Sequence, residues 1–268
     1  MVNLHIKPST PFTQMKLILN FIFLTAVSAQ LFAEGKNDTI ISGVPIRFDY
    51  DLNIFPESWL EEPIDAIGDE IDESEIPRSK HILITALNKY PQVMLNENLK
   101  GVYVLKNMAF YDVRFGGTNS NEYVYLTNNG VVNGYTNEYV ESTLHHEFSS
   151  ILYRNHPEYL DRDIWDRISK TGNADPDAGV GAIREGNAST DIDTAYCRIG
   201  FLSQYSQSDF ENDLNVLAEN LFNPAPGFWD IVHTYPLIRE KTRLLIQFYH
   251  SFDPVFTERY FRGLKVDF

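Results

Sequence analysis

The sequence predicts an α+β fold in which a small mixed sheet is followed by a motif helix and a mostly helical C-terminal half. Three observations support this prediction. β-rich runs gather before residue 127, apolar residues recur at helical spacing over 137–155, and further helical stretches follow from residue 209. An order of strands first and helices second is typical of α+β proteins with segregated elements.

The first residues predict export. From Met15 the chain runs through Lys16 and an apolar stretch into small residues, the pattern of a secretory signal with cleavage near Ala29 or Ala33. Either Met1 or Met15 is the start. The apolar stretch is shorter than the roughly 20 residues that a membrane span needs. We therefore expect no transmembrane span in the mature chain and a location in the periplasm, at the outer-membrane periphery or outside the cell. No cysteine lies near the cleavage points, so a lipobox is not expected.

Composition narrows the class of protein. A hydrophobic content of 43% supports a substantial core, and the formal net charge of −15 argues against a nucleic-acid partner, which would need clustered Lys and Arg. A single cysteine excludes an internal disulfide framework. We divide the chain into an N-terminal extension with signal peptide (1–29), an irregular acidic segment (30–75) and a single domain (76–268).

Local patterns predict the elements. The apolar residues between Ile40 and Phe48 indicate one early strand pair. A helix is expected over 78–91, beginning near Ser79 and ending at Pro91. The remaining expectations are strands at 101–105, 109–114 and 122–126, a mostly irregular stretch over 155–200, and helices over 137–155, 209–222, 236–251 and 254–262.

The helix expected over 137–155 carries the chemistry. In the pattern H-E-x-x-H, two histidines one helical turn apart bind zinc, and the glutamate acts as general base on the metal-bound water. His146 and Glu147 occupy the first two positions, and Ser150 stands where the second histidine belongs. The motif predicts a zincin-like fold with Glu147 as the catalytic residue and a degenerate zinc site.

Two nearby histidines are weaker substitutes for the missing ligand. His145 is rotated by about 100° around the helix from its neighbour. His156 lies at the offset of the third ligand in longer zinc motifs, but Tyr153 occupies the position where those motifs need glycine. The simpler interpretation is that His156 and Pro157 end the helix.

The stretch Thr143–Leu152 resembles the H-E-F-A-H-I-L segment of zinc-binding metallopeptidases associated with TonB-dependent nutrient-uptake loci in Bacteroidota. Further similarity lies in Gly200–Ser206 and from Phe228 to Leu264, so the resemblance covers roughly residues 90–264. It implies an exported zincin-like peptidase with zinc as cofactor.

The resemblance also implies a third zinc ligand, a glutamate at the position matched by Val216. An alternative register places Glu219 there instead. Asp213 and Glu219 each lie about one helical turn from Val216, so either carboxylate is a candidate. With Ser150 and Val216 both departing from the ligand pattern, the family's fold is expected and its zinc is in doubt.

Three functions follow from these residues. The first is a metallopeptidase homologue with weak or no peptidase activity, a pseudoenzyme. The second is an active zinc hydrolase that uses His146, Glu147 and Glu219. The third is a non-catalytic module of an outer-membrane uptake complex that holds a peptide or glycan on exposed aromatic side chains such as Tyr123, Tyr125 and Trp165.

Overall fold

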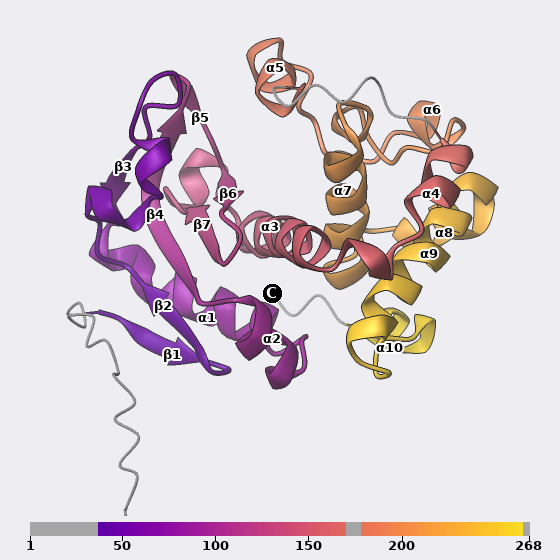
Figure 1. Ribbon diagram of the computed structural model, residues 1–268, viewed down its shortest axis with the longest axis horizontal. Helices are drawn as coiled ribbons and strands as arrows, with labels where there is room; N and C mark the ends of the chain where they lie inside the picture. Colours follow the sequence, from indigo (N-terminus) through magenta and orange to yellow (C-terminus); the bar gives the residue numbers. More distant parts are fainter. Residues whose placement is uncertain (1–36, 170–177, 265–268) are drawn as a thin grey trace, which may run out of the picture. The chain divides into compact units, whose positions relative to one another are not determined.

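The computed structural model describes residues 37–169 and 178–264, which belong to one compact unit (Figure 1). The segment interpreted as a signal peptide, with its cleavage points Ala29 and Ala33, lies outside the described residues. Among the described residues, no helix combines the length and apolar character of a membrane span.

The strands of the described residues form one mixed sheet in the order β1-β2-β4-β7-β6, with β3 and β5 also paired to β4. The β2–β4 and β4–β7 pairs are parallel and the other pairs are antiparallel. A small mixed sheet followed by helices confirms the predicted α+β class. The strands are β1 (Thr39–Ile41), β2 (Val44–Arg47), β3 (Ile67–Glu70), β4 (Gly101–Phe110), β5 (Val113–Arg114), β6 (Gly117–Asn119) and β7 (Tyr123–Thr127).

The sheet differs from the prediction where polar residues lie within a strand. Lys106 and Asn107 interrupt the apolar pattern, which therefore predicts two strands, at 101–105 and 109–114, where the structure has the single long strand β4. In the structure Asn107 pairs with Asp69 of β3, and Lys106 forms an ion pair with Asp72 at 3.0 Å. The sequence predicts no strand between residues 114 and 122, but Gly117 begins the edge strand β6.

The helices fill the rest of the described chain. They are α1 (Ile76–Leu87), α2 (Gln92–Asn98), α3 (Asn137–Asn155), α4 (Arg162–Ile168), α5 (Ala178–Arg184), α6 (Thr194–Cys197), α7 (Phe210–Phe222), α8 (Phe228–Thr234), α9 (Pro236–Phe252) and α10 (Glu258–Gly263). Short 3₁₀ helices lie at Leu52–Ile54, Glu57–Trp59, Glu73–Glu75, Val131–Asn133, Pro157–Tyr159 and Tyr205–Gln207.

Proline explains the main difference between the predicted helices and those of the structure. Helix α1 begins before Ser79, with Pro77 in its first turn, where its missing N–H costs nothing. It ends before Pro91, and Pro91 then precedes α2 as its N-cap residue. The single helix predicted over 78–91 is thus the first of two.

The two faces of the sheet bury different clusters. In β7, Val124 and Leu126 face the large core formed with the helices, while Tyr125 faces a smaller cluster with Phe55 and Phe110. Alternation along a strand sends successive side chains to opposite faces, which explains this division. Figure 1 shows α3 lying between the strands and α7, so one helix face packs on the sheet and another meets α7.

Candidate metal and catalytic site

Helix α3 positions the motif. Thr136 caps its start by accepting a hydrogen bond from the Tyr139 backbone N–H at 3.1 Å. Leu144 and Phe148 are fully buried in the large core. Because this apolar face fixes the rotation of the helix, the neighbouring face carries His146 and Glu147 toward α7 and the edge strand β6.

The side chain that meets His146 belongs to Glu219 of α7. His146 Nδ1 lies 3.2 Å from Glu219 Oε2. Val216, the position that the resemblance matches to the third ligand, is instead fully buried in the hydrophobic core. Of these two positions on α7, it is therefore Glu219, and not Val216, whose side chain meets His146.

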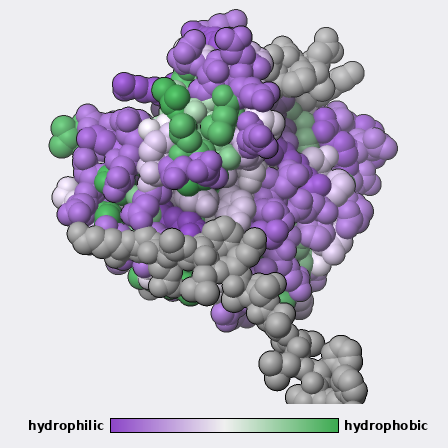
Figure 2. Space-filling view, turned by 60° about the vertical axis from the view of Figure 1, so that its left-hand side comes forward, coloured by the Kyte–Doolittle hydropathy of each residue, from purple (hydrophilic) through white to green (hydrophobic). Residues whose placement is uncertain are grey.

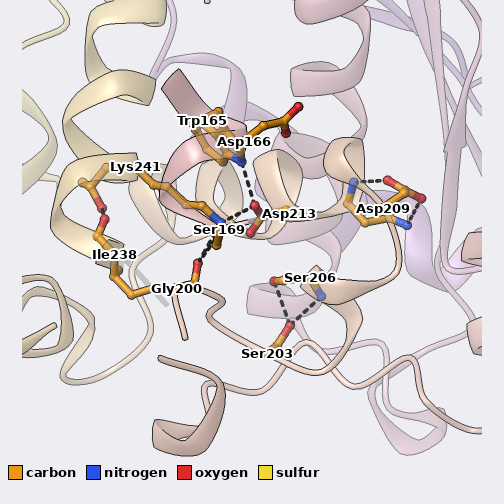
Figure 3. A network of polar contacts seen from close by, with 12 residues as sticks. Trp165, Asp166, Ser169, Gly200, Ser203, Ser206, Asp209, Asp213, Ile238 and Lys241 are labelled. Carbon is orange, nitrogen blue, oxygen red and sulfur yellow. Dashed lines mark hydrogen bonds and ion pairs between the residues drawn. The ribbon is translucent and has the colours of Figure 1, made fainter. Parts of the chain in front are cut away.

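Asp213 points elsewhere. Six residues along an α-helix amount to a rotation of about 240°, so Asp213 and Glu219 leave α7 in different directions. Asp213 Oδ2 accepts hydrogen bonds from Trp165 Nε1 at 2.7 Å and from Lys241 Nζ at 2.5 Å, and Figure 3 shows its carboxylate between those two side chains. Lys241 also donates to the Gly200 carbonyl at 2.7 Å. Asp213 is thus a member of a buried structural network.

Ser150 is buried at the position of the missing histidine. Its Oγ accepts a hydrogen bond from Asn215 Nδ2 at 2.7 Å. Asn215 lies one residue before Val216 on α7, and its side chain is also buried. The hydroxyl is therefore engaged by α7 and is a poor donor to a metal, compared with imidazole or carboxylate.

Glu147 is held by the edge strand. Its Oε2 accepts a hydrogen bond from Asn119 Nδ2 of β6 at 2.5 Å, and Arg154 Nη1 donates to Asn119 Oδ1 at 2.9 Å. Burial raises the pKa of Glu147 above its usual value, although the charge of His146 and the Asn119 hydrogen bond oppose this shift. The sequence did not single out Asn119; only its position opposite α3 reveals its role.

His146 and Glu219 form a charge-coupled pair. Burial alone lowers the pKa of His146, but the hydrogen bond to Glu219 and the charges of Glu147 and Glu219 outweigh it, so the pKa is raised. Burial raises the pKa of Glu219, and His146 opposes that change. The Tyr205 ring stacks on His146 at 6.2 Å between ring centroids. Tyr205 belongs to the Gly200–Ser206 segment of the resemblance, but the sequence assigned it no role.

His145 faces a different side of α3 from His146, because successive residues are rotated by about 100°. Tyr90 Oη lies 2.8 Å from His145 Nδ1, and Glu141 Oε1 lies 3.4 Å from His145 Nε2. Lys89 forms an ion pair with the same Glu141 and donates to the Phe222 carbonyl at 3.0 Å. Burial lowers the pKa of His145. This buried network links the motif helix α3 to the segment before α2 and to the end of α7.

The other aromatic and histidine candidates lie away from His146. His156 follows the last residue of α3, with Nε2 at 2.9 Å from Asn98 Oδ1 and its ring stacked on Tyr159. Trp165 lies in α4 and is fully buried, so the expectation of an exposed aromatic there is wrong. Tyr125 is also buried, whereas Tyr123 is half-buried.

A cleft surrounds the motif. It consists of a larger cavity of about 1020 Å³ and a smaller one of about 690 Å³. Both are lined by Phe115, Gly117, His146, Glu147 and Tyr205. Glu219 lines the larger cavity, and Ser150 and Asn215 line the smaller one.

The donor set does not fit a zinc site. Catalytic zinc takes three protein ligands and a water. His146 and Glu219 supply two donors here, and Ser150 stands in the third place. Throughout residues 37–169 and 178–264, no group of three or more His, Cys, Asp or Glu side chains is arranged to hold a metal ion.

Gly117 sets the distance between β6 and α3. A Cβ added there would lie 2.3 Å from Thr143 Cγ2 and 2.9 Å from Glu147 Oε1. We expect Gly117→Ala to push the strand from the helix and to lower the free energy of unfolding by about 1–3 kcal/mol, the usual cost of overpacking. Urea unfolding followed by circular dichroism measures this.

The matched control is Gly263→Ala in α10, because a Cβ there would meet no atom within 4 Å. Its stability should stay within about 0.5 kcal/mol of the parent. Equal stabilities of the two variants would contradict the close approach of β6 and α3.

Comparisons with known proteins do not identify a family for this chain. No protein-family model matches the chain, and a search of curated proteins finds no match. Among solved structures, the chain aligns with the crystal structure of a putative zinc-binding metallo-peptidase from Bacteroides caccae at 16% sequence identity and a TM-score of 0.46. The alignment covers 77% of this chain and 79% of that one. A likeness of this strength does not establish a family.

Proposed function

We propose that this protein is an exported zincin-like metallopeptidase homologue that binds extended peptides in its cleft and has weak or no zinc-dependent peptidase activity. One observation carries the proposal. His146 and Glu219 are paired directly with each other at 3.2 Å, while the remaining ligand position is Ser150, already bonded to Asn215. This geometry supports a homologue of zinc peptidases that lacks the ligands that zinc chemistry needs.

The edge strand supports a peptide ligand over a glycan. Among the strands of the described residues, β6 pairs with β7 alone, and its residues Gly117 and Asn119 line the smaller cavity beside Glu147. An exposed strand edge offers unpaired backbone N–H and C=O groups, and an extended peptide adds to such an edge by main-chain hydrogen bonds. A glycan has no matching backbone.

The proposed location rests on other features. The segment from Lys16 to Ala29 has the pattern of a secretory signal. The resemblance of Thr143–Leu152 to metallopeptidases of nutrient-uptake loci suggests an outer-membrane uptake complex as partner. Both belong to the proposal.

The second candidate is an active zinc hydrolase that uses His146, Glu147 and Glu219. The approach of Glu219 to His146 favours it, because both side chains reach one point of the cleft. A third protein ligand is what this candidate lacks, so metal content separates the two functions.

The decisive measurement is zinc content after dialysis against micromolar zinc. We expect the protein to retain much less than one zinc per chain. Ser150→His supplies an imidazole one helical turn from His146 on the same face, so this variant should gain about one zinc per chain. Adding His146→Ala to that variant is the matched control and should remove the gain.

The opposite result would favour the hydrolase. If the parent protein binds stoichiometric zinc and His146→Ala abolishes it, the pseudoenzyme proposal falls. Hydrolysis of a mixed peptide library with and without added zinc is the second measurement. Zinc-dependent cleavage that disappears in Glu147→Gln would assign Glu147 as general base.

A further inference from the structure

We propose that the centre of the cleft recognises a cationic side chain, an ammonium or a guanidinium, of the bound peptide. This inference rests on the proposed peptide-binding function and names the ligand class of that same site. It is argued from charge, from open hydrogen-bond acceptors and from the aromatic wall.

Charge is the first argument. The acids lining the larger cavity are Glu138, Glu147, Asp191 and Glu219, and its bases are Arg114 and His146. Glu147 and Glu219 are buried at the floor, with 9% and 8% of their surface exposed. Even with His146 protonated, two carboxylates face one imidazolium. The floor therefore carries a net negative charge, which a single cationic group neutralises.

The cations of the smaller cavity are already engaged. Arg154 pairs with Glu211 at 2.5 Å and also bonds Asn119, while Arg162 pairs with Asp166 at 2.9 Å. Arg154 lowers the pKa of Glu147 through its charge, but it is shared with Glu211, and the pKa of Glu147 remains raised overall.

Open hydrogen-bonding capacity is the second, independent argument. Asn215 is 2% exposed and lines the smaller cavity beside Ser150. Its Nδ2 donates to Ser150, whereas its Oδ1 is buried without a partner in the described part of the chain. A buried amide oxygen without a donor is costly, and a ligand N–H would satisfy it.

The two carboxylates add acceptors of the same kind. Glu147 bonds Asn119 through Oε2, and Glu219 bonds His146 through Oε2. Within residues 37–169 and 178–264, no hydrogen bond to either Oε1 atom is found, which leaves both atoms for a ligand in the cleft. The open atoms of Asn215, Glu147 and Glu219 are all acceptors, so the complementary group is one that only donates, as an ammonium or guanidinium does.

Aromatic rings complete the site. Tyr205 lines both cavities, and Tyr139 lines the larger one. A cation within about 6 Å of such a ring face is attracted by its quadrupole. The smaller cavity also has an apolar wall that includes Trp59, Ile64 and Phe110, suited to the aliphatic stem of a long basic side chain or to a neighbouring apolar residue.

The test compares three capped pentapeptides that differ at one central residue. The sequence is acetyl-Ala-Ala-Xaa-Ala-Ala-amide, with Xaa lysine, norleucine or glutamate, and isothermal titration calorimetry measures binding. We expect the lysine peptide to bind about tenfold or more tightly than the norleucine peptide, the scale of a charge-assisted hydrogen bond. The glutamate peptide should bind most weakly. Raising the salt should weaken the lysine peptide most.

Variants locate the effect. Glu219→Gln removes one charge and keeps an oxygen for His146, so it should abolish the preference for lysine over norleucine. Glu147→Gln should act in the same direction, which guards against one variant failing to fold. Glu258→Gln is the matched control, because Glu258 is an exposed acid of α10 paired with Arg262; it should leave all affinities unchanged.

The outcomes separate this inference from the proposed function. If the three peptides bind equally, peptide binding stands and the cationic site falls. If no peptide binds but acetyl-lysine methylamide binds in a manner that depends on Glu219, peptide binding falls and the cationic site stands. If neither binds, both fall. Tighter binding of the norleucine or glutamate peptide than of the lysine peptide overturns the inference outright.

Discussion

Replacing Val216 by glutamate is expected to destabilise the protein by about 3 kcal/mol or more, although a glutamate is the residue that the resemblance implies at this position. The Val216 side chain is fully buried in the large hydrophobic core. A carboxylate there has no partner and must either stay ionised in an apolar environment or take up a proton. Urea unfolding at neutral pH measures the loss of stability.

The control places the same charge at the surface. Gln247 is exposed on α9, so Gln247→Glu should change stability by less than about 0.5 kcal/mol. Val216→Glu should also leave zinc binding unchanged, in contrast to Ser150→His. If Val216→Glu proved as stable as Gln247→Glu, the orientation of α7 described above would be wrong.

The buried ion pair of Lys241 and Asp213 gives the second large effect. Both side chains are almost fully buried, at 1% and 3% exposure, and their charged atoms lie 2.5 Å apart (Figure 3). Lys241→Met removes the cation and leaves the Asp213 carboxyl group without its charged partner in the core. We expect a loss of about 3–5 kcal/mol at neutral pH, the usual cost of breaking one partner of a buried pair.

The loss should depend on pH. Burial raises the pKa of Asp213 to about 6, and Lys241 opposes that rise. A carboxyl group whose pKa is raised on folding contributes stability at low pH that is lost as the pH rises through the folded value. Without Lys241 the pKa rises further, so the deficit of Lys241→Met should grow as the pH increases above about 6. Unfolding curves between about pH 5 and pH 8 test this.

Two controls interpret this result. Lys106→Met breaks the pair of Lys106 with Asp72, whose side chains are 36% and 54% exposed, and should cost less than about 1 kcal/mol. Adding Asp213→Asn to Lys241→Met should recover part of the loss, because the asparagine oxygen still accepts from Trp165 without a charge. A Lys241→Met variant as stable as Lys106→Met would contradict the buried pair.

Local patterns were sufficient for the motif helix. Helix α3 runs over Asn137–Asn155 as predicted, because its N-cap residue and the spacing of its apolar residues both lie within one continuous segment of the sequence. The early strand pair was found in the same way. Errors arose where a polar residue or a glycine pairs with another strand, as Asn107 of β4 pairs with Asp69 of β3 and Gly117 of β6 pairs with Leu126 of β7.

The candidate site likewise has features that follow from local sequence and features that depend on tertiary packing. The sequence by itself determined that His146 and Glu147 share a helix with Ser150 in place of a second histidine, since these relations depend only on helical periodicity. It did not decide which of Asp213, Val216 and Glu219 faces His146. All three lie on α7, and the sequence does not show which side of this helix packs against α3. The packing of α7 against α3 sends Val216 into the core, Asp213 to Lys241 and Glu219 to His146. Asn215 of α7, Asn119 of β6 and Tyr205 also reach the cleft through tertiary packing, and no local sequence pattern predicts contacts between residues so far apart in the chain.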